Sequence, residues 1–249
     1  MNPTTSTPIP HLYLYQFFSR KDELVNARHY YRGQENITYV PVVDSNSEQH
    51  PALLSELDDD RYNPISYAFK NNFGQRKTEL LRQLQQEKKE GWIFFLDGDE
   101  YLTLDSLSHL SNSLPTHIDF SSPFCIGMPR NNTIKGVGPK DLEVLKSLKE
   151  TGGGNNVYEG SAVLPKEMRE HYLQRWMWPD IQPRLMSIEL TREIEGVTHE
   201  MPIAKRSEEN GMTVDFFPVI QHRKSVAEQE RMDRYHRDLL NKEREEKEV

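Results

Sequence analysis

The chain has little cysteine and no long apolar run. Cys125 is the single cysteine among 249 residues, which excludes an internal disulfide and a cysteine-based zinc site. A membrane span needs about 20 mainly apolar residues, whereas the best apolar block, residues 92–96, is five long. Residues 1–11 lack the basic start and apolar centre of a secretory signal. We therefore expect a cytoplasmic protein without a membrane span.

Hydrophobic residues are also scarce, at 35% against a typical value of about 45–50%. Acidic residues (39) outnumber basic residues (31), for a formal net charge of -8. This balance weighs against broad nucleic-acid binding. The 10% of aromatic residues argues against disorder, and the length fits one large or two small domains.

The first half alternates strand and helix patterns. β-rich runs cover 12–18 and 37–43, a helical pattern covers 66–90, and the apolar run 92–96 follows. An apolar run without polar alternation indicates a strand buried on both faces, as in a parallel sheet. Pro41 counts against a central position for the second run. The order indicates an α/β sheet. In the second half we expect strands at 118–128, 181–190, 194–199 and 214–222, and a helix over 225–242.

The sharpest chemical feature is the run Asp97-Gly98-Asp99-Glu100, directly after the buried strand. A D-x-D pair alone is weak evidence, and Asp58-Asp59-Asp60 is expected to be only a solvated loop. Position separates the two, because α/β sheets place ligands at the carboxyl ends of their strands. Neighbouring carboxylates repel, and a divalent cation such as Mg²⁺ or Mn²⁺ offsets that repulsion. A purely structural turn is the alternative.

The segment GWIFFLDGDEYL at 91–102 resembles the signature of GT-A-fold glycosyltransferases of family 2. In that family a buried strand is followed by a D-x-D metal-binding motif. Residues 42–45 resemble the end of that family's second strand, whose Asp, here Asp44, contacts the nucleotide base. Residues 72–77 resemble its F-x-x-A-R-N segment, with Arg76 at the Arg position and Lys77 in place of the Asn.

Three downstream segments agree in order. Residues 178–185 resemble the D-x-Q-x-R-L segment of the branch that includes lipopolysaccharide-core transferases. Residues 197–200 approximate that branch's V-H-E with one inserted residue, and 220–222 match its final I-x-H. The first strand departs from the pattern, because the usual Asn-Glu pair after it is replaced by Ser-Arg-Lys-Asp-Glu at 19–23.

The resemblance implies a Rossmann-like GT-A fold, an α/β architecture with a mixed, mainly parallel central sheet flanked by helices. It implies a single glycosyltransferase domain over 11–224, with a nucleotide-binding half at about 11–104 and an acceptor half at about 105–224. Residues 1–10 are then a flexible arm, and 225–249 are a C-terminal helix and tail.

The implied activity is metal-dependent, inverting transfer of a hexose or pentose from a nucleotide-sugar donor, a UDP-sugar by first expectation. The acceptor is a hydroxyl of a glycan, a lipid-linked sugar or a modified nucleobase, so nucleic acid is expected only as an acceptor. The implied cofactor is Mn²⁺ or Mg²⁺, which stabilises the diphosphate leaving group.

The resemblance also assigns roles to residues, each with a structural alternative. Asp180, or else Glu200, is the expected base that deprotonates the acceptor; a simple turn after a proline would explain Asp180 equally well. The expected metal ligands are Asp97, Asp99 and His222. The expected substrate-binding residues are Asp44, Arg76, Asp97, Arg130, Trp178 and Arg184, of which the arginines could bind phosphate bidentately and Trp178 could stack on a sugar or merely pack.

Other classes compete for the same motif. Haloacid-dehalogenase phosphatases use a strand followed by D-x-D-x-[T/V], but the fifth position here is Tyr101, and their motif normally opens the domain. A nucleotidyltransferase would need a glycine-rich N-terminal phosphate loop, which we do not find. A non-catalytic sugar-nucleotide-binding protein remains an alternative.

Overall fold

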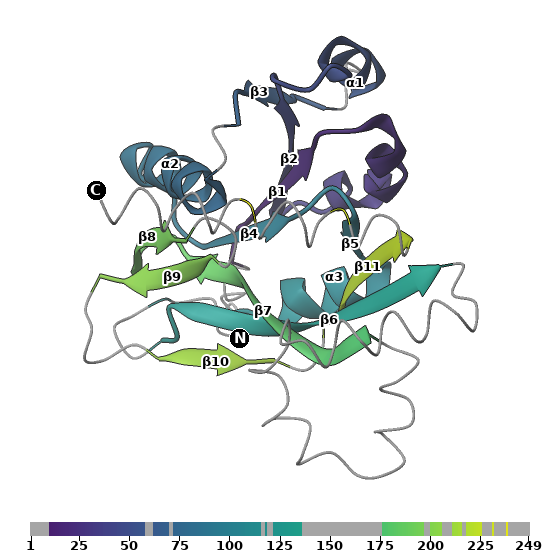
Figure 1. Ribbon diagram of the computed structural model, residues 1–249. Helices are drawn as coiled ribbons and strands as arrows, with labels where there is room; N and C mark the ends of the chain where they lie inside the picture. The colour runs from purple at the N-terminus through teal and green to yellow at the C-terminus, as the bar shows by residue number, and fades with distance from the viewer. Residues whose placement is uncertain are drawn as a thin grey trace, which may run out of the picture.

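A computed structural model describes residues 10–57, 62–69, 72–115, 118, 122–135, 176–196, 200–205, 211–215, 218–225, 231 and 238 (Figure 1). Two 3₁₀ helices follow the first strand, η1 (Lys21–Asn26) and η2 (His29–Arg32). The α-helices are α1 (His50–Leu57), α2 (Phe73–Gln86) and α3 (Leu104–Ser113). The strands are β1 (Leu12–Phe18), β2 (Ile37–Asp44), β3 (Ile65–Tyr67), β4 (Trp92–Leu96), β5 (Glu100–Leu102), β6 (Cys125–Lys135), β7 (Trp176–Ser187), β8 (Thr191–Glu195), β9 (Met201–Ala204), β10 (Met212–Val214) and β11 (Ile220–Ser225).

The main sheet has the strand order β3-β2-β1-β4-β7-β6-β11-β5, and β10 pairs with β6 beside it. Most pairings are parallel: β1 with β2 and β4, β2 with β3, and β6 with β10 and β11. The antiparallel pairings are β4–β7, β6–β7 and β5–β11. A small antiparallel sheet of β8 and β9 packs beside α2 (Figure 1). The expected mixed, mainly parallel α/β sheet flanked by helices is confirmed.

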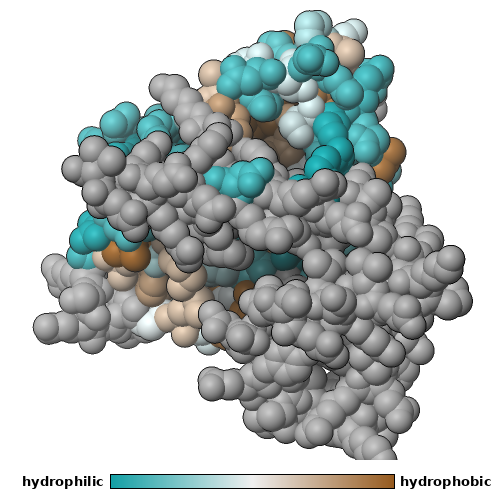
Figure 2. Space-filling view, viewed as in Figure 1, coloured by the Kyte–Doolittle hydropathy of each residue, from teal (hydrophilic) through white to brown (hydrophobic). Residues whose placement is uncertain are grey.

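Strand β4 is the centre of the core, as its apolar run predicts. All five of its side chains are buried. Those at 92, 94 and 96 share one cluster with Leu107 and Leu110 of α3, and those at 93 and 95 share another with Leu80 and Leu84 of α2. Because successive side chains of a strand point to opposite faces, the two helices cover opposite faces of the sheet. The outer side of α2 is hydrophilic (Figure 2).

The first-half helix is shorter than its sequence pattern predicts. The expected range was 66–90, whereas α2 begins at Phe73 and ends at Gln86. The side chain of Asn72 accepts a hydrogen bond from the backbone N–H of Gln75 and caps the helix start. The residues at 65–67 instead form β3, which adds a short edge strand to β2.

Strand β2 has a neighbour on each side, so the expectation that Pro41 keeps it out of the sheet interior is wrong. Pro41 lies opposite Gln16 of β1. On the other side β3 pairs only with residues 42–44 of β2. Pro41 therefore lies before the stretch of β2 that pairs with β3. Its missing N–H costs no hydrogen bond to β3.

The second half also differs in its boundaries. The strand expected at 118–128 begins at Cys125, and the one expected at 194–199 is β8, which ends at Glu195. The strand expected at 214–222 is two strands, β10 and β11, both parallel to β6 but at different places along it. The arm at 1–9 and most of the helix expected at 225–242 lie outside the described residues. None of the helices that the structure describes combines the length and apolar character needed to cross a bilayer.

Candidate functional site

The strand order places the acidic run where the parallel sheet reverses its direction of growth. From β1 the chain moves outward to β2 and β3, then returns to the other side of β1 as β4. Such a reversal in a parallel sheet opens a crevice at the carboxyl ends of the two strands, where α/β proteins bind ligands. Gln16 of β1 lies opposite Leu96 of β4, so the loop at 19–26 and the turn at 97–100 meet at this edge.

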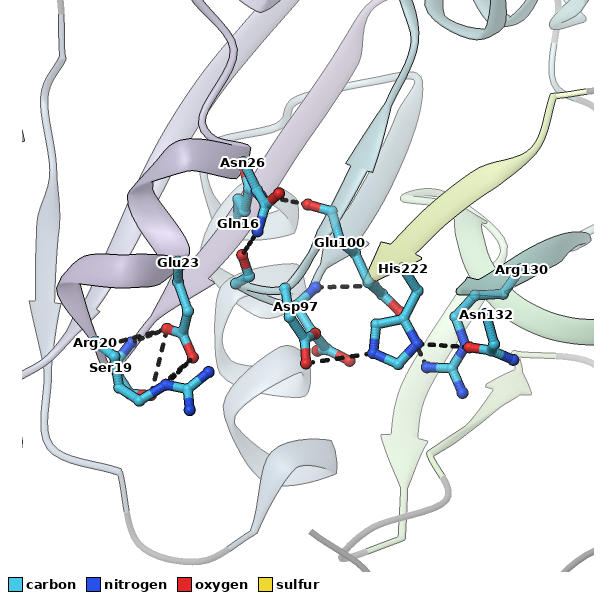
Figure 3. A network of polar contacts seen from close by, with 12 residues as sticks. Gln16, Ser19, Arg20, Glu23, Asn26, Asp97, Glu100, Arg130, Asn132 and His222 are labelled. Carbon is cyan, nitrogen blue, oxygen red and sulfur yellow. Dashed lines mark hydrogen bonds and ion pairs between the residues drawn. The ribbon is translucent and has the colours of Figure 1, made fainter. Parts of the chain in front are cut away.

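Asn26 ties the two loops together, and Glu23 orders the first of them (Figure 3). The carboxylate of Glu23 accepts hydrogen bonds from the backbone N–H groups of Ser19 (2.7 Å) and Arg20 (3.0 Å). The side-chain amide of Asn26 donates to the carbonyl of Gly98 at 2.9 Å. Burial raises the pKa of Glu23, opposed in part by the Ser19 N–H. A Cβ at position 98 would lie 2.6 Å from the backbone carbonyl oxygen of Phe17 as well as 2.6 Å from Glu23 Oε2, so this turn requires glycine.

Glu100 anchors the acidic turn, a role that the sequence analysis did not assign. Its side chain is fully buried and its carboxylate accepts from the backbone N–H of Asp97 (2.9 Å). It also accepts from Arg130 Nη1 (3.0 Å) and Arg184 Nη2 (3.1 Å). Its backbone carbonyl accepts from the side chain of Gln16 at 2.7 Å. In the sequence, Glu100 is visible only as the last acid of the run at 97–100.

Asp97 is engaged by arginine. Arg184 Nη2 lies 2.5 Å from Asp97 Oδ2, and Nη1 lies 3.4 Å from Oδ1. Burial alone would raise the pKa of Asp97, but the charges of Arg184 and Lys77 outweigh it and the pKa is lowered. Burial likewise opposes the charge of Arg184, yet Asp97 and Glu100 raise its pKa well above the ordinary value. The predicted substrate-binding Arg184 thus contacts the predicted metal ligand Asp97.

Asp99 and His222, which lie far apart in the sequence, are neighbours at this site. His222 Nε2 lies 3.2 Å from Asp99 Oδ2, and the side chains are 5% and 20% exposed. The other ring nitrogen, Nδ1, lies 2.5 Å from Asn132 Oδ1 (Figure 3). Strand β11 holds His222 between β5 and β6, opposite Glu100 on one side and Asn132 on the other.

The donor atoms of this pair fit a divalent cation. Ligands at about 2.1 Å and right angles around an octahedral ion lie roughly 3 Å apart, close to the separation of Asp99 Oδ2 and His222 Nε2. Within the described ranges no group of three or more His, Cys, Asp or Glu side chains is arranged to hold a metal. Ions such as Mg²⁺ are commonly bound by one or two side chains plus substrate phosphates and water. The pair is therefore suited to an ion that arrives with, or is completed by, a phosphate ligand.

Glu200, the second candidate base, forms an ion pair. Its Oε1 lies 2.8 Å from Nζ of Lys77, and the two side chains are 15% and 2% exposed. Lys77 comes from α2, while Glu200 directly precedes β9. The sequence marked Lys77 only as a departure from the family's Asn, and its ion-pair partner could not be read from that position.

Asp44, expected at the nucleotide base, and Arg76, expected to bind phosphate, both have local partners. Asp44 Oδ1 accepts from the backbone N–H groups of Asn46 (2.9 Å) and Phe69 (3.2 Å), so it closes the turn after β2. The guanidinium of Arg76 lies over the ring of Tyr67, 3.5 Å from its centroid. Each residue therefore has a structural role near the carboxyl ends of β2 and β3. These ends lie at the same edge of the sheet as the acidic turn.

Trp178 and Asp180 lie in β7, where the backbone of Asp180 is opposite Arg130 of β6. Their side chains, and His199 beside Glu200, lie outside what the structure describes.

Comparisons with known proteins give a likeness at the level of structure but not of sequence. No protein-family model and no curated protein matches the sequence. Among solved structures, the chain is similar to the crystal structure of S. aureus TarS 1-349, with a TM-score of 0.46 and 12% sequence identity. The match covers 86% of this chain and 60% of that chain, so this chain spans less than two thirds of the solved structure's length.

Proposed function

We propose that this protein is a glycosyltransferase that moves a sugar from a nucleotide-sugar donor to an acceptor hydroxyl, with inversion and with a divalent cation. The observation that carries the proposal is the pairing of Asp99 with His222 at the carboxyl end of β4. This is the crevice where an α/β sheet reverses its strand order. The family-like segments at 97–100, 184–185 and 220–222 meet at this place, which supports one shared site.

The chemistry needs stabilisation of a departing nucleoside diphosphate. A cation held by Asp99 and His222 supplies Lewis-acid stabilisation of the leaving oxygens when it is bound. Asp97 is the third candidate ligand, with Arg184 holding its carboxylate in place. Arg130 is 20% exposed and donates to Glu100, which orients its guanidinium; a guanidinium is a group that binds phosphate oxygens. The donor of first choice is a UDP-sugar.

The acceptor hydroxyl must lose a proton to a carboxylate within hydrogen-bonding reach. Glu200 is held by Lys77 at 2.8 Å, which favours a supporting role for it. Asp180 lies in β7, opposite Arg130 and four residues before Arg184. We therefore assign the base to Asp180 first and to Glu200 second.

The test is a thermal-shift panel of UDP, GDP, CDP, dTDP and ADP, each with and without Mn²⁺. A ligand at about 100 times its dissociation constant adds about 2.7 kcal/mol of stability. One nucleotide should stabilise the protein only with Mn²⁺, and Asp99→Asn should remove that effect while the variant stays folded. Asp105→Asn, an exposed carboxylate in the first turn of α3, is the control and should keep it.

Two results would overturn the proposal. One is a folded wild-type protein that none of the five nucleotides stabilises with Mn²⁺. The other is Mn²⁺-dependent stabilisation that persists in Asp99→Asn. Phosphatase activity without any sugar donor would favour the haloacid-dehalogenase alternative, although here the acidic turn follows the fourth strand along the chain rather than opening the domain.

A further inference from the structure

We propose that Asn132 is a positioning residue of the cation site, which fixes the tautomer and orientation of the His222 imidazole so that Nε2 faces the ion. The inference rests on the proposed function. It concerns a residue of β6 that no motif singled out and that lies on the far side of the imidazole from Asp99.

The strand register places Asn132 beside His222. Strands β6 and β11 are parallel, with Asn132 opposite His222 and Asn131 opposite Gln221. Side chains alternate between the faces of a strand, so the two pairs point to opposite faces of the sheet. Asn131 Nδ2 donates to Gln221 Oε1 at 2.9 Å, while Asn132 and His222 are both buried. The register therefore places the Asn132–His222 pair at the candidate site and the Asn131–Gln221 pair on the opposite face.

The chemistry of the contact selects one tautomer. A side-chain amide oxygen accepts hydrogen bonds and cannot donate them, so His222 Nδ1, 2.5 Å from Asn132 Oδ1, carries the proton. In the neutral ring the lone pair then belongs to Nε2, the atom that lies 3.2 Å from Asp99 Oδ2. Metal-binding histidines usually have such a partner on the second nitrogen, and loss of the partner typically costs 10–100-fold in metal affinity.

The first measurement needs no variant at Asn132. Nitrogen-15 NMR of histidine-labelled, metal-free protein distinguishes the Nδ1–H from the Nε2–H tautomer, and the His222 signal is identified by its absence in His222→Gln. We expect the Nδ1–H tautomer in the wild type. An Nε2–H tautomer would overturn the inference.

The second measurement is the affinity for Mn²⁺ alone, from the free Mn²⁺ seen by electron paramagnetic resonance. Asn132→Leu removes the acceptor and should weaken Mn²⁺ binding about 10–100-fold. Asn132→Asp keeps an acceptor oxygen and should bind within a few-fold of wild type. Asn131→Leu is the matched control: it breaks the pair on the opposite face and should leave Mn²⁺ affinity unchanged.

The outcomes separate the inference from the proposed function. Equal Mn²⁺ affinity in wild type and folded Asn132→Leu overturns the role of Asn132 and leaves the cation site standing. Equal weakening in Asn131→Leu and Asn132→Leu also overturns it, since the effect would then be general loosening of β6. Wild-type protein that binds no Mn²⁺, alone or with any of the five nucleotides, overturns both proposals. If Asn132→Leu does not fold, weak binding by Asn132→Asp together with an Nε2–H signal decides against the inference, and wild-type-like binding with an Nδ1–H signal supports it.

Discussion

The guanidinium of Arg184 bridges from β7 to the carboxylate of Asp97, with Nη2 2.5 Å from Oδ2. The same nitrogen lies 3.1 Å from Oε1 of the fully buried Glu100. One arginine that is 6% exposed thus neutralises two acids of the turn after β4. The stability of the turn and the charge presented at the site both depend on it.

We therefore expect Arg184→Met to destabilise the protein by about 1.5–3 kcal/mol, because Asp97 loses its arginine and the buried Glu100 keeps only Arg130 as a charged partner. Urea unfolding measures the change. Arg192→Met is the control, since Arg192 is 55% exposed and pairs with its neighbour Glu193; it should change stability by at most about 0.5 kcal/mol. Similar losses in the two variants would mean that the Arg184 ion pairs contribute little.

Gly98→Ala should disturb the same turn by steric conflict. The added Cβ would lie 2.6 Å from Glu23 Oε2 and 2.6 Å from the carbonyl oxygen of Phe17. Relief requires the loops after β1 and β4 to separate, a cost of about 1–3 kcal/mol, and Mn²⁺-dependent nucleotide binding should weaken with it. Gly211→Ala, where nothing lies within 4 Å of the new Cβ, should be neutral in both assays. A wild-type-like Gly98→Ala would show that the Glu23–Gly98 contact is not needed.

The sequence was sufficient for the central strand and the position of the acidic turn, because both are encoded locally. An uninterrupted apolar run predicts burial on two faces, and β4 is buried on both. The start of α2 was predicted seven residues too early because its main local signal is the capping residue Asn72, and a strand of three residues such as β3 has no period to detect.

The division of labour among the acids could not be read from the sequence. Asp97, Asp99 and Glu100 are the same chemical type within four positions, and only their partners distinguish them. Those partners come from strands far along the chain: Arg130 and Arg184 reach Glu100 across 30 and 84 residues. His222 was assigned from the family resemblance, whereas its second partner, Asn132, follows from the β6–β11 register, which is a property of the folded sheet.

Substitutions of the two candidate bases, Asp180 and Glu200, should have different effects on sugar transfer. Asp180→Asn should keep Mn²⁺-dependent nucleotide binding and abolish sugar transfer, because the acceptor hydroxyl would lose its proton acceptor. Glu200→Gln leaves Lys77, which is 2% exposed, without its charged partner, so its main effect should be a loss of stability in urea unfolding. Full transfer activity in Asp180→Asn, with activity abolished in a folded Glu200→Gln, would move the base to Glu200.

Cys125 should resist alkylation in the folded protein. It begins β6 fully buried in the cluster that includes Leu81 of α2 and Met186 of β7, and burial raises its thiol pKa to about 12. The thiolate is the reactive form, so at pH 8 its fraction is on the order of 10⁻⁴, and access is blocked as well. Iodoacetamide at pH 8 should leave the native protein unmodified by mass spectrometry and label it fully in urea, where the thiol regains an ordinary pKa. Because ionisation increases as the pH approaches that raised pKa, native labelling should remain slow across the neutral range.

Since the chain has one cysteine, the labelled mass reports unfolding directly and can rank the stability of the Arg184, Gly98 and Glu200 variants. Rapid labelling of the native wild type would contradict the burial of Cys125 at the start of β6.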